Sequence, residues 1–175
     1  MKHYLTLLFM LFVLFVSLTA CAETANVEPT PPAIHYGEDI CEACGMIISD
    51  ARYAAAYITA DGEGRTFDEV AGMIITHLDK QEDVVAFFVH DYQTQDWIRG
   101  ETATYVLSSD LVTPMALGLI AFDSTTNATE FMTQSGSGQL FSFEEVLAHY
   151  EMNNGMDMSS ETMPDMEHTH DDNTN

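Results

Sequence analysis

Sulfur-bearing side chains are concentrated in one short stretch, CEACGM, at residues 41–46. Cys41, Cys44 and Met46 place two thiols and a thioether within six residues. Thiolates and thioethers are soft donors that select Cu(I) over harder cations. In an extended segment, side chains two residues apart share a face, so we expect Cys44 and Met46 to act together. Met115, in VTPMALG, is the best candidate for a third donor because it follows a proline in a predicted loop.

Two other chemistries for the CxxC pair are open from the residues alone. A structural zinc site normally has four N or S ligands in two spaced pairs, and the chain has one such pair. A thioredoxin-like redox pair is expected at the start of a helix, whereas Gly45 and extended-looking residues follow here. CxxC pairs outside the cytosol often carry out thiol-disulfide exchange. A thiol-disulfide oxidoreductase is therefore the alternative function. That alternative requires both cysteines, while the copper hypothesis requires Cys44 and not Cys41.

Residues 1–20 have the features of a lipoprotein signal peptide. An apolar run at 5–16 follows a lysine and is too short for a stable transmembrane span. It ends in LTAC, which resembles a bacterial lipobox, so Cys21 is expected to carry lipid and begin the mature chain. The sequence therefore predicts a protein anchored by lipid to the extracytoplasmic face of a bacterial membrane.

Charge excludes one class of partner. The formal net charge is −23, with 28 acidic residues and only 5 Lys and Arg. Binding to nucleic acid requires clustered basic side chains, so no nucleic-acid partner is expected. The acidity favours solubility and attracts cations only loosely.

Composition divides the rest of the chain into three parts. Residues 21–38 combine the lipidated Cys21 with a proline-containing stretch that is typical of a flexible tether. Residues 39–149 form the globular domain. Residues 150–175 are acidic, lack large aliphatic side chains and are predicted to be a disordered tail. The tail is rich in methionine and histidine, so it is interpreted either as a solvated extension or as a loose copper collector. Those side chains are Met152, Met156, Met158, Met163, Met166, His168 and His170.

The domain shows one order of elements twice. A predicted strand at 53–59 is followed by a turn into residues 65–68, an amphipathic helix from Phe67 to Leu78 and a buried strand at 84–89. The second half repeats this order with predicted strands at 102–107 and 119–123, a helix at 124–133 and an extended segment at 139–143. The pattern predicts an α+β fold of two related strand-strand-helix-strand (ββαβ-like) units in one compact domain, with a closing helical segment after residue 143. Phe67-Asp68 and Phe122-Asp123 should occupy equivalent places.

These features together resemble the NosL family, the accessory lipoproteins of nitrous oxide reductase. The resemblance covers about residues 39–148. It rests on the lipobox, CEACGMIISD, FDEVAGMI, VVAFFVHDYQTQDW, TYVLSSDLVTPMALGLIAFDS and FSFEEVL. Its most specific marks are Cys44-Gly45-Met46 and Pro114-Met115 followed by Ala121-Phe122.

The resemblance implies a non-enzymatic Cu(I) metallochaperone whose metal ligands are Cys44, Met46 and Met115. It also implies delivery of copper to nitrous oxide reductase through an ABC-type assembly complex. Two features depart from what the resemblance leads us to expect. The residues after the motif lack the Gln that many members carry there, and members also occur apart from nitrous oxide reduction. A general copper-homeostasis lipoprotein is therefore a second alternative, and a substrate-binding lipoprotein without metal is a third.

Overall fold

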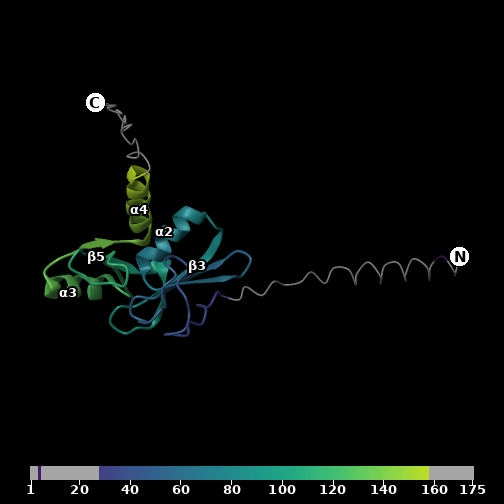
Figure 1. Ribbon diagram of the computed structural model, residues 1–175, viewed down its shortest axis with the longest axis horizontal. Helices are drawn as coiled ribbons and strands as arrows, with labels where there is room; N and C mark the ends of the chain where they lie inside the picture. The colour runs from purple at the N-terminus through teal and green to yellow at the C-terminus, as the bar shows by residue number, and fades with distance from the viewer. Residues whose placement is uncertain (1–3, 5–27, 158–175) are drawn as a thin grey trace, which may run out of the picture.

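A computed structural model describes Tyr4 and residues 28–157 of the chain (Figure 1). The first half of the domain has the element order ββαβ. Its elements are β1 (Ala55–Thr59), β2 (Gly64–Phe67), α2 (Val70–Lys80) and β3 (Val84–His90). β1 pairs antiparallel with both β2 and β3, and β4 (Trp97–Arg99) extends the sheet to the order β2-β1-β3-β4. The central strands are almost wholly buried, as their continuous apolar runs predict.

The second half repeats this order, which confirms the predicted fold class. Its elements are β5 (Thr104–Leu107), β6 (Leu119–Phe122), α3 (Thr125–Ser135) and β7 (Gln139–Phe141). They form an antiparallel sheet of order β6-β5-β7, the same arrangement as β2-β1-β3. Phe67 and Phe122 each end the second strand of their unit, and an Asp and an N-cap residue then lead into the helix. The two Phe-Asp dipeptides therefore occupy equivalent positions, as predicted.

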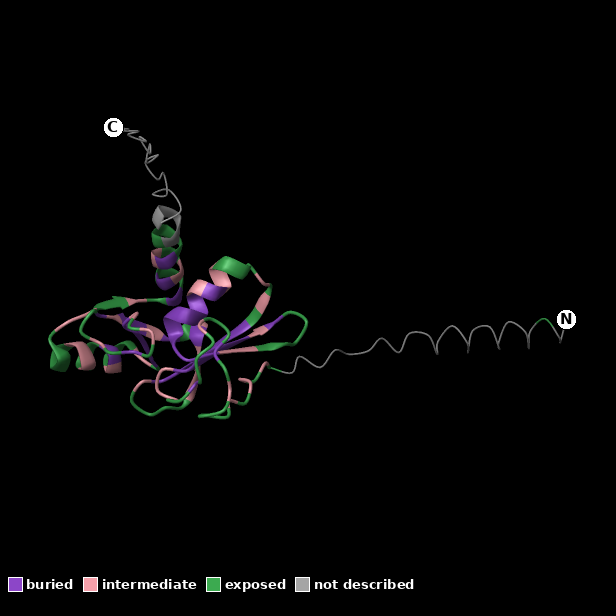
Figure 2. Ribbon diagram, viewed as in Figure 1, coloured by how far each residue is buried: buried purple, intermediate pink, exposed green. Residues whose placement is uncertain are grey.

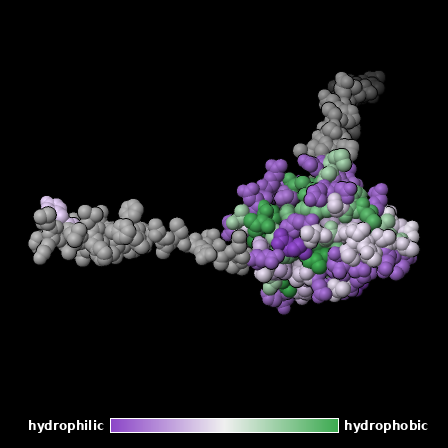
Figure 3. All heavy atoms as spheres, turned by 180° about the vertical axis from the view of Figure 1, so that it is seen from behind, coloured by the Kyte–Doolittle hydropathy of each residue, from purple (hydrophilic) through white to green (hydrophobic). Residues whose placement is uncertain are grey.

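A single core joins the two units. α2 contacts β1 and β2 of its own unit, β6 of the other unit and α4 (Phe143–Asp157). A parallel bridge between Asp91 and Ala121 links the two sheets directly. Figure 2 shows the buried residues concentrated in the start of α2 and in the strands beside it. On the face seen in Figure 3, hydrophobic residues form separate patches among hydrophilic ones. Burying apolar surface from both units in one core stabilises them as one compact body.

Besides shifts of one to three residues at element ends, of which the largest is the start of α2 at Val70 because Phe67 ends β2, four differences separate the structure from the sequence-based expectation. β4 was not predicted, because three half-buried residues carry little periodic signal. The strand expected from residue 102 begins at Thr104, since residues 100–102 form a short 3-10 helix (η1). α4 continues to Asp157, so the described part of the predicted tail is helical. The rest of the tail, residues 158–175, lies outside the described residues, as does Cys21. Among the described residues, no helix is long and apolar enough to cross a membrane.

The fourth difference is that the end of the predicted tether belongs to the domain. Ile34 packs against the core, and the Tyr36 hydroxyl lies 2.8 Å from Nε2 of His90. His90 Nδ1 lies 2.7 Å from the carbonyl oxygen of Gln95, which only accepts, so Nδ1 carries the proton and Nε2 accepts from Tyr36. His90 is buried and stacks on Trp97, with ring centroids 3.8 Å apart. These contacts attach the chain to β3 before residue 39.

We expect this attachment to weaken in acid. Burial lowers the pKa of His90 below its ordinary value. The Gln95 carbonyl and Asp96 raise this pKa, but their effect is smaller than that of burial. The folded protein therefore binds fewer protons than the unfolded chain below about pH 6.5, and stability falls as pH decreases there. His90→Gln should cost about 1–3 kcal/mol at pH 8 through its buried partners, and the cost should shrink towards pH 5. Denaturant unfolding of both proteins across this range measures it. A loss of stability in His90→Gln that is the same at every pH would contradict a lowered pKa of His90.

Candidate metal centre

Backbone hydrogen bonds hold the CEACGM loop against β2. The N–H of Glu42 donates to the carbonyl of Thr66 at 3.0 Å. Within the loop, the N–H of Cys41 donates to Met46 at 2.8 Å, and that of Gly45 donates to Cys41 at 2.9 Å. A bridge between the residues on either side, Ile40 and Ile47, closes the base of the loop. The loop is thus a tight reversal whose position is determined by the edge of the first sheet.

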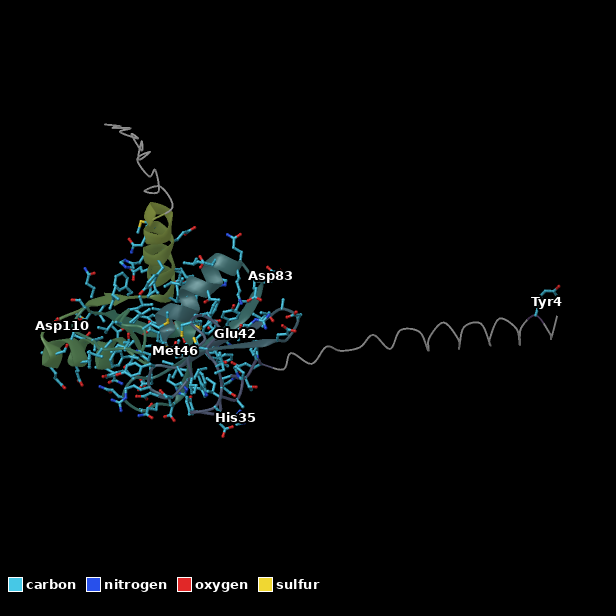
Figure 4. The ribbon with its side chains drawn as sticks, in the orientation of Figure 1. Tyr4, His35, Glu42, Met46, Asp83 and Asp110 are labelled. Carbon is cyan, nitrogen blue, oxygen red and sulfur yellow. The ribbon has the colours of Figure 1, made fainter. Side chains whose placement is uncertain are left out.

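The loop is not extended between Cys44 and Met46, which corrects the local geometry expected from sequence. Gly45 adopts φ +72°, a left-handed conformation that glycine tolerates without strain. The alternation of side chains along a strand therefore does not apply here. Met46 is 44% exposed, whereas Cys44 is half-buried. Figure 4 labels Met46, whose side chain is open to solvent.

Asp68 lies between the two thiols. Cys41 Sγ lies 3.1 Å from Oδ1 of Asp68 and Cys44 Sγ lies 3.5 Å from Oδ2, so each thiol donates to one carboxylate oxygen. The three ligand atoms lie within 4.8 Å of one another. A carboxylate at this place could cap α2, but Glu69 is the N-cap residue and makes no side-chain cap hydrogen bond. The carboxylate binds the thiols instead.

The two cysteines differ in environment, although both are free thiols. Cys41 is buried, and burial raises the pKa of its thiol to about 12. The backbone N–H groups of Asp68, Cys44 and Ala43 hydrogen-bond its sulfur and lower the pKa in opposition to burial. The protonated Cys41 is therefore a weak nucleophile, because the thiolate is the reactive form.

Met115 reaches the same place from the second unit. Its backbone lies in a turn in which the N–H of Ala116 donates to the carbonyl of Thr113 at 2.9 Å, with Pro114 at the second position. Proline favours that position because its ring presets φ. Ala116 at φ +60° then reverses the chain, a conformation that costs a residue other than glycine about 1 kcal/mol. The turn therefore holds Met115 in one defined position.

Glu69 anchors this turn to α2. Its Oε2 accepts the N–H of Met115 at 3.1 Å, and its side chain is fully buried. The side chain of Met115 then lies over the first turn of α2, where a Cβ on Gly72 would be 3.3 Å from Sδ. The same point is 3.5 Å from Cβ of Ala43 in the sulfur loop. Met115 thus meets the CEACGM loop at the start of α2.

The sequence offered four sulfur atoms as possible metal donors. The structure places three of them near the start of α2. Cys41 and Cys44 face Asp68. Met115 lies beside Ala43, a residue of the loop between the two cysteines. Met46 is on the same loop with its side chain towards solvent. Sequence reasoning missed Asp68 as a donor. The repeat gave no signal for it, because the two aspartates differ only in the fold: Asp123 is exposed and accepts from Asn127, whereas Asp68 is buried and accepts from the thiols.

Comparisons with known proteins agree with this architecture. The NosL family profile matches residues 32–150. The crystal structure of the copper chaperone NosL from Shewanella denitrificans superposes with a TM-score of 0.57 at 22% sequence identity, over 67% of this chain and 96% of that one. The comparison with curated proteins returned no significant match. Because the family profile spans most of the chain and the folded domain, the chain belongs to the NosL family.

Proposed function

We propose that the protein is an extracytoplasmic Cu(I) metallochaperone in which Cys44 supplies a thiolate and Met46 and Met115 supply thioethers. The observation that carries this is the position of Met115, whose sulfur lies on α2 beside the CEACGM loop although it is 69 positions after Met46 in sequence. Family membership and the copper chaperone of the same fold support the choice of metal. The three sulfur donors form a set that is typical of Cu(I).

The mixed thiolate-thioether set suits transfer rather than storage. Cys44 is the only donor that becomes anionic, so it should contribute most of the affinity. The exposed Met46 leaves one side of the ion accessible to an incoming ligand. A three-coordinate ion can bind that ligand before a resident donor leaves. We therefore propose a carrier without catalytic activity, anchored through lipid on Cys21 so that it works at the membrane surface.

The oxidoreductase alternative has less support. Cys41 and Cys44 lie in a loop rather than at a helix start, and the Cys41 thiol has a raised pKa. Thiol-disulfide exchange needs a thiolate that forms readily near ambient pH. The described geometry therefore favours metal binding over redox work.

We propose nitrous oxide reductase, reached through an ABC-type assembly complex, as the recipient of the copper. Cells producing the reductase and its assembly proteins together with Cys44→Ser should yield reductase that contains less copper and less activity than cells with the wild-type chain. Cys41→Ser is the matched control and should support normal loading. Copper content per reductase, measured after purification, decides this. If cells with Cys44→Ser produce reductase with its full copper content but tolerate copper less well, the general copper-homeostasis function would be supported instead.

A further inference from the structure

The second sheet has an open edge at the place where the first sheet has a further strand. In the first unit, β3 pairs with β4 on the side away from β1. β7 is the equivalent of β3, and among the described residues it pairs only with β5. After β7 the chain continues into α4 instead of returning as another strand (Figure 1). The other edge strand, β6, is covered by the first unit, because the N–H of Tyr92 donates to the carbonyl of Ala121.

β7 lacks the side chains that usually block a sheet edge. Its residues are Gln139, Leu140 and Phe141, whereas protected edges carry charged residues or proline. Leu140 is 39% exposed, and Gln139 is exposed as well. Alternate residues of a strand direct their N–H and C=O groups to opposite sides, so part of the β7 backbone faces outward. An added strand would satisfy these groups with main-chain hydrogen bonds.

The charge of the second half of the chain determines which kind of strand fits this edge. Residues 100–175 contain 13 Asp and Glu and no Lys or Arg. Glu130, Glu144 and Glu145 are exposed on α3 and α4, the two helices that contact β7. A second copy of the chain would bring the same negative charge against the edge, and so would the acidic tail, so both are repelled. A strand that carries Lys or Arg would instead be attracted.

A hollow of about 590 Å³ at the start of β7 can receive one side chain of such a strand. Gln139 of β7, Ser108 after β5, and His149 and Tyr150 of α4 line it, and Leu107 adds an apolar wall. Apolar carbon beside hydroxyl and amide oxygens suits the aliphatic stem and charged head of Lys or Arg.

We propose that β7 is a docking edge for an extended, Lys- or Arg-bearing segment of a partner protein. The segment adds a fourth strand to the second sheet and places one basic side chain in the hollow. The proposed metal ligands lie at the start of α2 and not on β7, so this docking can be tested without metal. Loss of copper binding would leave it standing, and loss of docking would leave the copper function standing.

Titration of the full-length chain with a short synthetic peptide tests the proposal. The peptide alternates lysine and valine, and its binding is followed by NMR and by amide hydrogen exchange. We expect exchange at residues 139–141 to slow, because the added strand protects the outward N–H groups. A peptide of the same sequence with N-methylated amides keeps the charge but cannot pair as a strand. It should bind at least about tenfold more weakly, since several main-chain hydrogen bonds are lost.

Two charge reversals of equal size locate the docking site. Glu144→Lys, beside β7, should weaken peptide binding at least about threefold. Asp83→Lys, at an exposed position before β3 in the first unit, changes the net charge equally and should keep affinity within about twofold of wild type. The unfolding midpoint of each variant checks its fold, and Glu144→Gln with Asp83→Asn replaces the pair if either chain unfolds.

Three results would overturn the proposal. Equal losses in the two charge variants, or equal binding of the N-methylated peptide, would show general attraction to an acidic surface. Peptide binding without slower exchange at residues 139–141 would place the peptide elsewhere. Pairing of two copies through β7 in the absence of peptide would identify the occupant of the edge as a second chain.

Discussion

We expect Cys44→Ser to lower the Cu(I) affinity of the full-length chain roughly 100-fold or more, equivalent to about 2.7 kcal/mol or more of binding free energy. Serine keeps the approximate size of the side chain but replaces a soft anionic donor with a neutral hydroxyl, which Cu(I) disfavours. The side chain is only half-buried in the CEACGM loop, so the substitution should leave the fold intact. Competition with a chromogenic Cu(I) chelator measures the loss.

Cys41→Ser is the matched control for this experiment. It changes the same atom in the same loop, but the residue lies outside the proposed Cu(I) donor set. We expect its Cu(I) affinity to stay within a few fold of wild type. An equal loss in both variants would indicate a site with two thiolates, and no loss in either would remove the sulfur loop from copper binding. Disulfide exchange activity that disappears in both variants would support the oxidoreductase instead.

The second large effect concerns Met115, whose sulfur can be removed or displaced. Met115→Leu deletes the thioether with little change of volume, which should cost less than about 1.5 kcal/mol of stability. We expect Cu(I) affinity to fall at least about tenfold, since one of two neutral donors is lost. Met132→Leu, a half-buried methionine on α3, is the control and should bind Cu(I) as the wild type does.

Gly72→Ala tests the position of the sulfur without removing it. The added Cβ would lie 3.3 Å from Sδ of Met115, closer than most such contacts, so the thioether must move. Alanine in a helix is more favourable than glycine by roughly 0.5–1 kcal/mol. We therefore expect Cu(I) affinity to fall while the unfolding free energy is unchanged or rises. A chain that is more stable and binds copper equally well would show that Met115 does not depend on this space.

Local sequence determined the elements of the fold and the chemistry of the sulfur loop. The apolar spacing from Phe67 to Leu78 predicts α2, and the VVAFFV run predicts β3, because burial on one face leaves a periodic signal in adjacent residues. The repeated Phe-Asp pairs identified the two units for the same reason. Thiols and thioethers within six residues already restrict the metal to a soft one, since donor type is a property of each side chain.

Only the tertiary structure decided which groups surround those sulfur atoms. The pairing of the CEACGM loop with Thr66 brings Cys41 and Cys44 to Asp68, and Glu69 brings Met115 to the same helix end. Periodicity reports whether a residue is buried, but it carries no information about which loop of one unit packs on the helix of the other. That choice follows from the shared core of the two sheets, where many distant residues contribute together. The carboxylate that joins the two thiols is therefore visible in the fold and not in the spacing of the cysteines.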